Sequence, residues 1–382
     1  MASWIGKMIL ETVWLVLFAL HTVPLAAYIF YMKRVAQKRP WDIKLDSGYE
    51  PTVSVIVPTF NEANTIVRKL SNMVEADYPK GKMEIIVVDS ASTDDTAKRI
   101  QGWMGGHTEI RAKLVSESER RGMVKALNLG LKYANGEIVL KTDADCLWQF
   151  DSLRNAVKYM ADPLVGSVAG LHIITAHKDT AAVRVERTYR EFYRWLRIGE
   201  SKLYSTVLYE GELMLVKRKL LEDVGGFDEE MGADDVPTAL RVIENGHRAI
   251  TAEDAFFLEL TPYTWGERFN QKVRRARHVL QALWKYKYLN FKDKTSFHRL
   301  ILPMETYIYT INPLFIIPLI FLSMAMVIKY PWLLALTPVL LISKIREFAI
   351  THLTNTFIMQ LAILKEVKGK EHATWQKIGE IR

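Results

Sequence analysis

Residues 137–148, EIVLKTDADCLW, join a short apolar run to two aspartates that are separated by a single alanine. A β-branched apolar run of this length predicts a buried strand. Side chains alternate along an extended chain, so Asp143 and Asp145 are expected on the same side of it. Two such carboxylates repel each other unless they share a cation, and hard oxygen ligands suit Mg²⁺ or Mn²⁺, which also bind substrate phosphates. A polar turn after a strand is the alternative.

The segments before this strand repeat its design. TVSVIVPTFNEANTI (52–66) predicts a buried strand that ends at Pro58, and MEIIVVDSASTDDTAKRI (83–100) predicts another that ends at Asp89. Alternation of such strands with amphipathic segments over residues 49–269 predicts an α/β domain with a mainly parallel sheet. Three successive strand ends then place Glu62, Asp89 and the two aspartates at one edge, where open α/β sheets bind ligands.

Long apolar segments flank this domain. Residues 8–32 contain one acid, Glu11, and are followed by the basic KRVAQKR, which predicts a retained membrane span whose C-terminal end is cytoplasmic. Residues 306–328 carry no charge and predict a second span. Residues 348–364 predict a third, with an interfacial or re-entrant piece at 331–343. The expected divisions are therefore 1–34 (membrane helix), 49–269 (α/β domain), 270–305 (interfacial helices), 306–366 (membrane helices) and 367–382 (cytoplasmic tail).

Composition excludes several classes of protein. The single cysteine, Cys146, excludes an intrachain disulfide and a cysteine-based zinc site, and it is expected to be a buried packing residue. The chain has neither a Walker A run nor a G-x-G-x-x-G fingerprint, which counts against NTPase and dinucleotide-binding functions. The net charge of +8 is assigned to basic segments beside a lipid bilayer, and no nucleic-acid partner is expected. Residues 184–204 mix aromatic and basic side chains and predict an interfacial helix or a packed core helix.

A second acidic pair, Asp234 and Asp235, follows the glycine-rich VGGFDEEMG (224–232) and precedes the helical pattern VPTALRVI (236–243). An acid near Pro237 at a helix start is also ordinary capping chemistry. The pair is therefore either a catalytic feature or a helix terminus.

Taken in order, SVIVPTFNEANTI, VVDSASTDDT, RGMVKALNLGL, TDAD and VGGFDEEMGADDVPTALRVIENGHRAI resemble the family-two inverting nucleotide-sugar glycosyltransferases with the GT-A fold. The resemblance covers about residues 53–261. With its apolar segments the chain is similar to a reduced cellulose or hyaluronan synthase. It is also similar to dolichyl-phosphate mannose synthases and to the membrane mannosyltransferases of archaeal glycan assembly.

The resemblance implies roles for individual residues. Asp145, together with Asp143, would bind the metal, with Mn²⁺ favoured over Mg²⁺, and Asp235 would be the catalytic base beside Asp234. The donor-binding residues would be Pro58, Glu62, Asp89, Lys125 and Asp143. Asp89 would accept hydrogen bonds from the base, although Ser90 and Ala91 stand where the family often has Asp-Gly. A turn-capping role for Asp89 and a solvated position for Lys125 are the alternatives.

NQKVRRARH (270–278) resembles the family's QxxRW signature through Gln271 and Arg274, which would lie near the diphosphate or the acceptor. Arg275 replaces the tryptophan, and this argues against an enzyme that threads a polymer. A basic helix on anionic lipid is the alternative for this segment.

The function expected is a membrane-bound, metal-dependent, inverting hexosyltransferase that uses a nucleotide sugar, with GDP-mannose favoured. The acceptor would be dolichyl phosphate or a lipid-linked glycan, because the apolar segments and the basic residues 274–278 offer a place for an anionic lipid headgroup, and the choice between the two stays open. The alternatives are a processive polysaccharide synthase that uses a UDP-sugar, and a catalytically inactive scaffold that binds nucleotide sugars.

Overall fold

The computed structural model describes residues 2–292 and 294–368. Its centre is an eight-stranded sheet. The strands are β1 (Val53–Thr59), β2 (Met83–Asp89), β3 (Arg111–Ser116), β4 (Ile138–Lys141), β5 (Cys146–Trp148), β6 (Val165–Thr175), β7 (Met214–Lys217) and β8 (Arg248–Leu260). Their order in the sheet is β3-β2-β1-β4-β7-β6-β8-β5.

Strands β3, β2, β1 and β4 run parallel, whereas β7 is antiparallel to both of its neighbours and β5 is antiparallel to β8. The expected α/β fold is therefore confirmed, with a mixed sheet. Thr59 is in register with Asp89, and Ile56 with Lys141, so the carboxyl ends of these strands meet at one edge.

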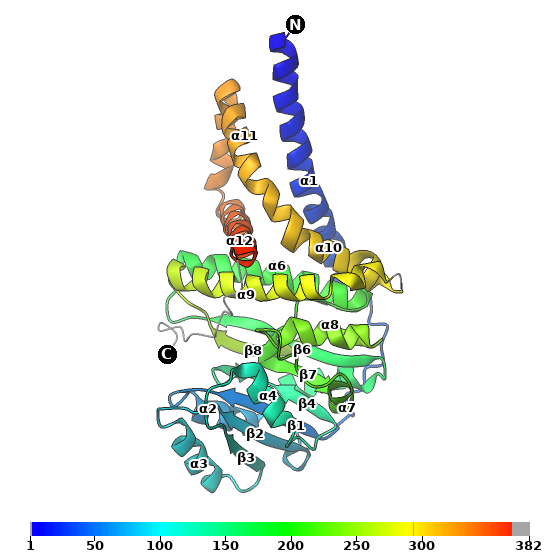
Figure 1. Ribbon diagram of the computed structural model, residues 1–382, viewed down its shortest axis with the longest axis vertical. Helices are drawn as coiled ribbons and strands as arrows, with labels where there is room; N and C mark the ends of the chain where they lie inside the picture. Colours follow the sequence, from blue (N-terminus) through cyan, green and yellow to red (C-terminus); the bar gives the residue numbers. More distant parts are fainter. Residues whose placement is uncertain (1, 293, 369–382) are drawn as a thin grey trace.

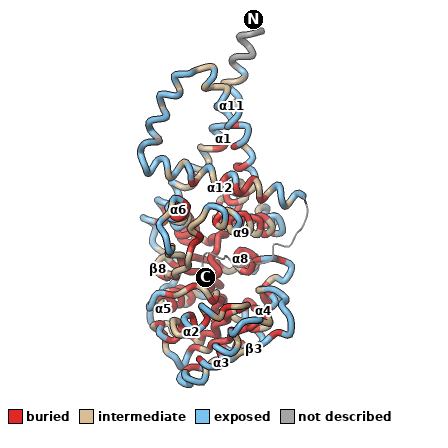
Figure 2. The backbone as a smooth tube through the Cα atoms, turned by 90° about the vertical axis from the view of Figure 1, so that its left-hand side faces the viewer, coloured by how far each residue is buried: buried red, intermediate tan, exposed pale blue. Residues whose placement is uncertain are grey.

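Helices cover both faces of the sheet (Figure 1). They are α2 (Ile66–Glu75), α3 (Thr96–Gly106), α4 (Met123–Leu131), α5 (Ser152–Val157), α7 (Arg218–Asp223) and α8 (Asp235–Glu244). Along β1, Val55 and Val57 join one hydrophobic cluster while Ile56 between them joins the other. This alternation produces two cores, and the buried segments in Figure 2 are concentrated around the sheet.

A layer of long amphipathic helices lies across one end of the domain. α6 (Ala181–Leu203) and α9 (Trp265–Lys285) form it, and α12 (Ser343–Lys368) packs against both (Figure 1). α6 contains most of the expected interfacial helix at 184–204. Its second half, from Leu196 to Leu203, is buried against the domain and α1 (Ala2–Lys38).

Two helices leave this layer on the side opposite the sheet (Figure 1). Over Ile9–Lys38 and Phe297–Lys329 they are long and apolar enough to cross a membrane. The second consists of α10 (Leu302–Thr306) and α11 (Ile316–Lys329), joined through π-helical and 3₁₀ turns over residues 307–315. Large apolar side chains such as Phe30, Phe321 and Ile328 are exposed along them. Continuous apolar surface of this kind is uncommon on a protein that is surrounded by water.

The third expected span differs from the structure. Residues 348–364 belong to α12, which packs on α6 and α9, and the described chain contains only two helices of membrane-spanning length and apolarity. The physical reason is composition, because Thr, Asn and His interrupt the apolar residues and Thr351, Thr356 and Gln360 are buried in the helix contacts. Residues 331–341 form a short 3₁₀ helix before α12. The expected tail at 367–382 lies outside the described residues beyond Lys368.

α1 and α6 touch through their backbones. A Cβ atom on Gly199 would lie 2.4 Å from the carbonyl oxygen of Met32, so only glycine permits this approach. Beside it the Tyr28 hydroxyl donates to Glu200 at 2.6 Å, and the Lys202 ammonium donates to the Ala36 carbonyl at 3.0 Å. The C-terminal part of α1 is therefore an integral part of the helix layer.

Candidate active site

A cavity of about 530 Å³ opens at the carboxyl ends of the parallel strands. Strand ends β1 and β4, the first turn of α4, the turn before α8, the end of β8 and one face of α9 contribute to its walls. Of the residues expected at a site, those that line it are Pro58, Glu62, Lys125, Asp143, Asp145, Asp234, Asp235, Gln271 and Arg274. Asp89 lies next to the lining residue Ser90. Residues as far apart in the sequence as Pro58 and Arg274 thus line one cavity at the carboxyl edge of the sheet, as predicted.

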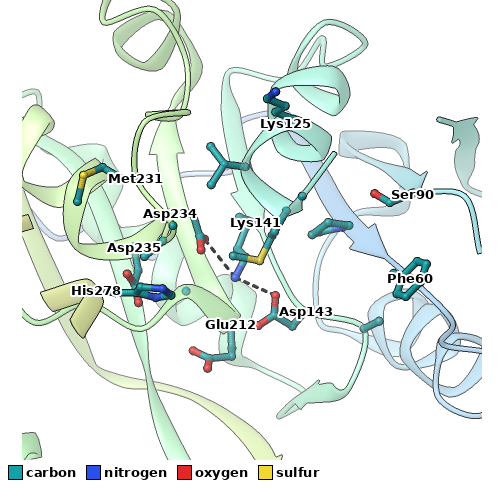
Figure 3. A pocket seen from close by; sticks show the side chains of 18 of the residues that line it. Phe60, Ser90, Lys125, Lys141, Asp143, Glu212, Met231, Asp234, Asp235 and His278 are labelled. Carbon is teal, nitrogen blue, oxygen red and sulfur yellow. Dashed lines mark ion pairs between the residues drawn. The ribbon is translucent and has the colours of Figure 1, made fainter. Parts of the chain in front are cut away.

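Lys141, the last residue of β4, links the two acidic pairs. Its buried ammonium lies 2.8 Å from Asp143 and 3.1 Å from Asp234, and Figure 3 shows it between these two carboxylates. Burial by itself would raise the pKa of Asp143, but Lys141, with smaller contributions from Lys69 and Arg275, outweighs this effect and holds that pKa below its ordinary value. Asp143 is therefore ionised at neutral pH.

Asp143 and Asp145 follow β4 and face the same cavity. Among the described residues no set of three or more His, Cys, Asp or Glu side chains is arranged to hold a metal ion. A hard divalent cation commonly takes only one or two protein carboxylates and completes its shell with water and substrate phosphate oxygens. The two aspartates beside a cavity of this size fit that mode of binding.

Asp89 already has a local role. Its carboxylate accepts hydrogen bonds from the hydroxyl and the backbone N–H of Ser92, the latter at 3.3 Å. At the start of α3 the N-cap residue Asp95 makes no side-chain capping hydrogen bond, and Asp94 accepts from the Thr96 N–H at 3.0 Å. Asp89 therefore stabilises the turn after β2, and any contact with a nucleotide base would be made by a carboxylate that this turn holds in place.

Two cations differ in their surroundings. Lys125 is exposed on the first turn of α4 at the rim of the cavity. Arg274 is half-buried on α9 and has no carboxylate partner among the described residues. Burial, reinforced by Arg275, lowers the pKa of Arg274 to about 10, so its guanidinium stays charged at neutral pH. A charged group that lacks a carboxylate partner and faces a cavity suits an anionic ligand.

Asp235, the first residue of α8, is the strongest candidate for a base. Its carboxylate accepts a hydrogen bond from the Val236 N–H at 2.7 Å. Burial, and next the neighbouring Asp234, raise the pKa of Asp235 to about 6. A carboxylate with a pKa near the working pH is suited to accept a proton. Asp234 itself is engaged by Lys141, so the two members of the pair have different surroundings.

Sequence patterns missed Lys141, Glu212 and Glu259 as lining residues, and they noted Arg275 and His278 only as members of the basic segment. Arg275 forms ion pairs with Glu212 at 3.3 Å and Glu259 at 3.1 Å. Glu259 lies near the end of the strand pattern FFLEL. An acid near the end of an apolar run is the same pattern that identified Asp143 and Asp145, so the sequence could have indicated Glu259 as well. Glu212 is buried just before the antiparallel strand β7. No periodic pattern in the sequence predicts its ion pair with Arg275 of α9, about 60 residues later.

Comparison with known proteins identifies the group to which this chain belongs. The model of glycosyl transferase family 2 matches residues 54–225. The structure of the Pyrobaculum calidifontis mannosyltransferase PcManGT, in complex with GDP-Man and Mn²⁺, is 38% identical and covers 95% of this chain and 100% of its own, with a TM-score of 0.80. This chain belongs to glycosyltransferase family 2. Its mixed sheet is accordingly the GT-A fold.

Curated relatives in family 2 are more distant. The Bacillus subtilis protein named probable glycosyltransferase YdaM is 27% identical over 305 residues, which are 75% of this chain and 71% of that protein. The poly-beta-1,6-N-acetyl-D-glucosamine synthase of Staphylococcus epidermidis is 26% identical over 252 residues, which are 65% of this chain and 60% of the synthase.

Proposed function

We propose that this family 2 protein is a membrane-anchored, inverting mannosyltransferase that uses GDP-mannose, a divalent metal ion and a polyprenol-linked acceptor. The observation that supports it most is one cavity that is lined by Asp143, Asp145 and the half-buried Asp235, with Lys141 paired both to Asp143 and to Asp234, the neighbour of Asp235. The likeness to a mannosyltransferase in complex with GDP-Man and Mn²⁺ favours this donor and this metal.

Each wall of the cavity would have its own task. Asp143 and Asp145 would hold the metal ion, which neutralises the diphosphate as it leaves. Arg274 would bind the diphosphate, because its charge lacks a carboxylate partner among the described residues. Asp235 would take the proton from the attacking group. Attack from the Asp235 side with departure on the metal side is a single displacement, which inverts the anomeric carbon.

The placement of the chain follows from its two apolar helices. Ile9–Lys38 and Phe297–Lys329 would cross the bilayer, and the amphipathic α6 and α9, with α12 packed on them, would lie at its surface. Basic residues 33–39 directly after the first apolar segment favour a cytoplasmic α/β domain.

The test is transfer from radiolabelled GDP-mannose, compared with UDP-glucose and UDP-N-acetylglucosamine, by the purified full chain with Mn²⁺. We expect mannose transfer, and NMR of the product should show the opposite anomeric configuration to the donor. Turnover of a UDP-sugar alone would reject the mannosyl donor, and retention of configuration would reject the single displacement.

The processive synthase is the second candidate, since a curated relative bears that name. Arg275 in place of the signature tryptophan and the small number of apolar helices favour addition of one sugar instead. Mass spectrometry of products distinguishes the two, because a processive enzyme yields a ladder of lengths and a single-addition enzyme yields one product mass.

A further inference from the structure

The buried face of α2 contains one charged side chain. Ile66, Leu70, Met73 and Val74 form its apolar stripe, and Lys69 lies within that stripe with a side chain that is 0% exposed. Lysine is rarely buried so completely, because its ammonium group then loses its hydration. Among the described residues Lys69 forms no ion pair with a carboxylate. Packing of the core alone therefore does not explain a lysine at this position.

The Lys69 ammonium lies on the buried side of the segment that carries the two candidate metal-binding aspartates. It donates a hydrogen bond to the Thr142 hydroxyl at 2.8 Å and lies 3.4 Å from the Cys146 sulfur. The centroid of the Trp148 ring is 4.4 Å away, which is the distance of a cation–π contact. Thr142 and Cys146 directly enclose residues 143–145 in the sequence. Lys69 is thus in contact with both ends of the D-A-D segment.

Other contacts also hold this segment in place. The Thr142 hydroxyl donates to the Glu212 carbonyl at 2.6 Å and accepts from the Trp148 indole N–H at 3.1 Å. The backbone of Trp148 exchanges two hydrogen bonds with the side-chain amide of Asn72, at 2.8 and 3.0 Å. None of these bonds involves the side chain at position 69. The contribution that distinguishes Lys69 from an apolar residue is therefore its charge.

The charges beside the two aspartates nearly cancel. Lys141 pairs with Asp143 and Asp234, and Lys69 is the second buried cation next to the segment. Burial lowers the pKa of Lys69, while the charges of Asp143 and Asp145 act in the opposite direction and favour its protonated form. Even with all three carboxylates ionised, these three acids and two lysines carry only one net negative charge. A divalent ion that arrives alone therefore meets weak attraction.

A divalent ion that arrives with a nucleoside diphosphate is in a different position. The diphosphate bears about three negative charges at neutral pH, by analogy with the second pKa of about 6 of phosphorylated side chains. Its complex with a divalent ion is therefore close to neutral, and a nearby cation such as Lys69 hardly affects its binding. The charge of Lys69 thus opposes the bare ion much more than the complex.

We infer that Lys69 makes Asp143 and Asp145 a metal site only in the presence of the nucleotide, because its buried charge opposes binding of a divalent ion without the diphosphate. This rests on the proposed function. Lys69 acts through the aspartates, so it tunes the site and is not a catalytic residue. After transfer, the same charge favours release of the metal together with the nucleoside diphosphate.

The size of the effect makes it measurable. Even at the dielectric constant of water, a unit charge and a doubly charged ion about 8 Å apart interact strongly enough to change a dissociation constant about fivefold. The lower dielectric constant near buried groups increases this change. Removal of the Lys69 charge should therefore tighten the binding of Mn²⁺ alone.

The experiment measures the Kd for Mn²⁺, from the EPR signal of the free ion, with the purified full chain at low ionic strength. The variants are Lys69→Met and Lys69→Gln, which both remove the charge, although Gln can still donate to Thr142. In both, the Kd for Mn²⁺ alone should fall at least about fivefold, whereas the Kd for the Mn²⁺–GDP complex should change less than about twofold. Arg68→Gln, at the exposed next position of α2, is the matched control and should change neither constant.

Two results would overturn the inference. Unchanged Mn²⁺ binding in both variants would make Lys69 a packing residue. Weaker binding of both Mn²⁺ and the Mn²⁺–GDP complex would mean that Lys69 holds the segment in shape instead. Thermal unfolding without ligand shows which variants fold, and one folded variant is enough to decide. If neither folds, the wild type decides, because Mn²⁺ binding that is equally tight with and without GDP would also overturn the inference.

Failure of the inference is distinguishable from failure of the proposed function. If the wild type binds Mn²⁺ together with GDP and transfers mannose, but the Lys69 variants behave like it, only the inference is rejected. If the wild type binds no Mn²⁺ either with or without GDP, the metal assignment of the proposed function is rejected.

Discussion

Asp235→Asn should remove activity and raise stability at the same time. Asn keeps the shape and can still accept the hydrogen bond from the Val236 N–H, but it cannot take a proton. If Asp235 is the general base for a hydroxyl, kcat should fall by about 10²–10⁴-fold. In the wild type, log kcat should fall with a slope approaching one below pH 6, because Asp235, with a pKa of about 6, becomes protonated.

The stability gain follows from the same pKa. Folding raises the pKa of Asp235 from 3.8 to about 6, so keeping it ionised in the folded state costs up to about 3 kcal/mol at 1.36 kcal/mol per pKa unit. The sign is that of an acid with a raised pKa: the cost is complete above pH 6, shrinks as pH falls and disappears near 3.8. Asn does not bear this cost, so Tm should rise by several degrees at pH 8 and hardly change at pH 4.

The assay combines initial rates from pH 5 to 8 with thermal unfolding followed by tryptophan fluorescence in one detergent. Asp223→Asn, at an exposed position at the end of α7, is the control and should change neither quantity. A variant that loses Tm along with activity at pH 8 would make Asp235 a structural residue. A variant that keeps normal kcat would refute the base assignment.

Three other expectations are as direct. Asp145→Asn, or EDTA added to the wild type, should abolish transfer while the protein stays folded. In the variant, the Tm increase on adding Mn²⁺ with GDP should vanish. Full activity in EDTA would contradict the metal assignment. Asp89→Ala should raise the KM for the donor at least tenfold, because losing hydrogen bonds to a charged acceptor costs about 1.5–3 kcal/mol. Ser92→Ala is the control. An equal rise in KM in that variant would mean that Asp89 only stabilises the turn. Lys141→Met should destabilise the fold by about 3–5 kcal/mol at pH 7, since it leaves buried carboxylates without their cation. That loss in Tm should shrink toward pH 4 as the carboxylates protonate, and a loss that is independent of pH would contradict this account.

The sequence predicted what depends on local pattern. Apolar runs followed by acids located the strand ends, and the parallel register of β1, β2 and β4 brought Glu62 and the two aspartates of the β4–β5 loop to one cavity. It did not predict which acids would be paired. Lys141 is the last residue of a strand whose side chains are all buried, and its partner Asp234 is more than 90 residues away.

Long-range charge balance also lay beyond the sequence. Arg275 was recognised as a departure from the signature, but its two glutamate partners come from different elements and became evident only in three dimensions. The third expected span stays a prediction, and residues 348–364 form a helix that packs on α6 and α9. Hydropathy ranks a segment by composition alone and does not reveal contacts such as the hydrogen bond from the Thr351 hydroxyl of α12 to the Val185 carbonyl of α6 at 3.5 Å.

The backbone contact at Gly199 makes α1 a rigid support of the α/β domain instead of a flexible tether. A catalytic domain on a flexible linker sweeps a volume and can meet its substrate at any height or angle. Here the carbonyl oxygen of Met32 occupies the place that a side chain at position 199 would need, so α1 and α6 pack without a gap between their backbones. The reacting centre therefore keeps one height and one orientation relative to the apolar helices, and an acceptor has to be presented to it at that level.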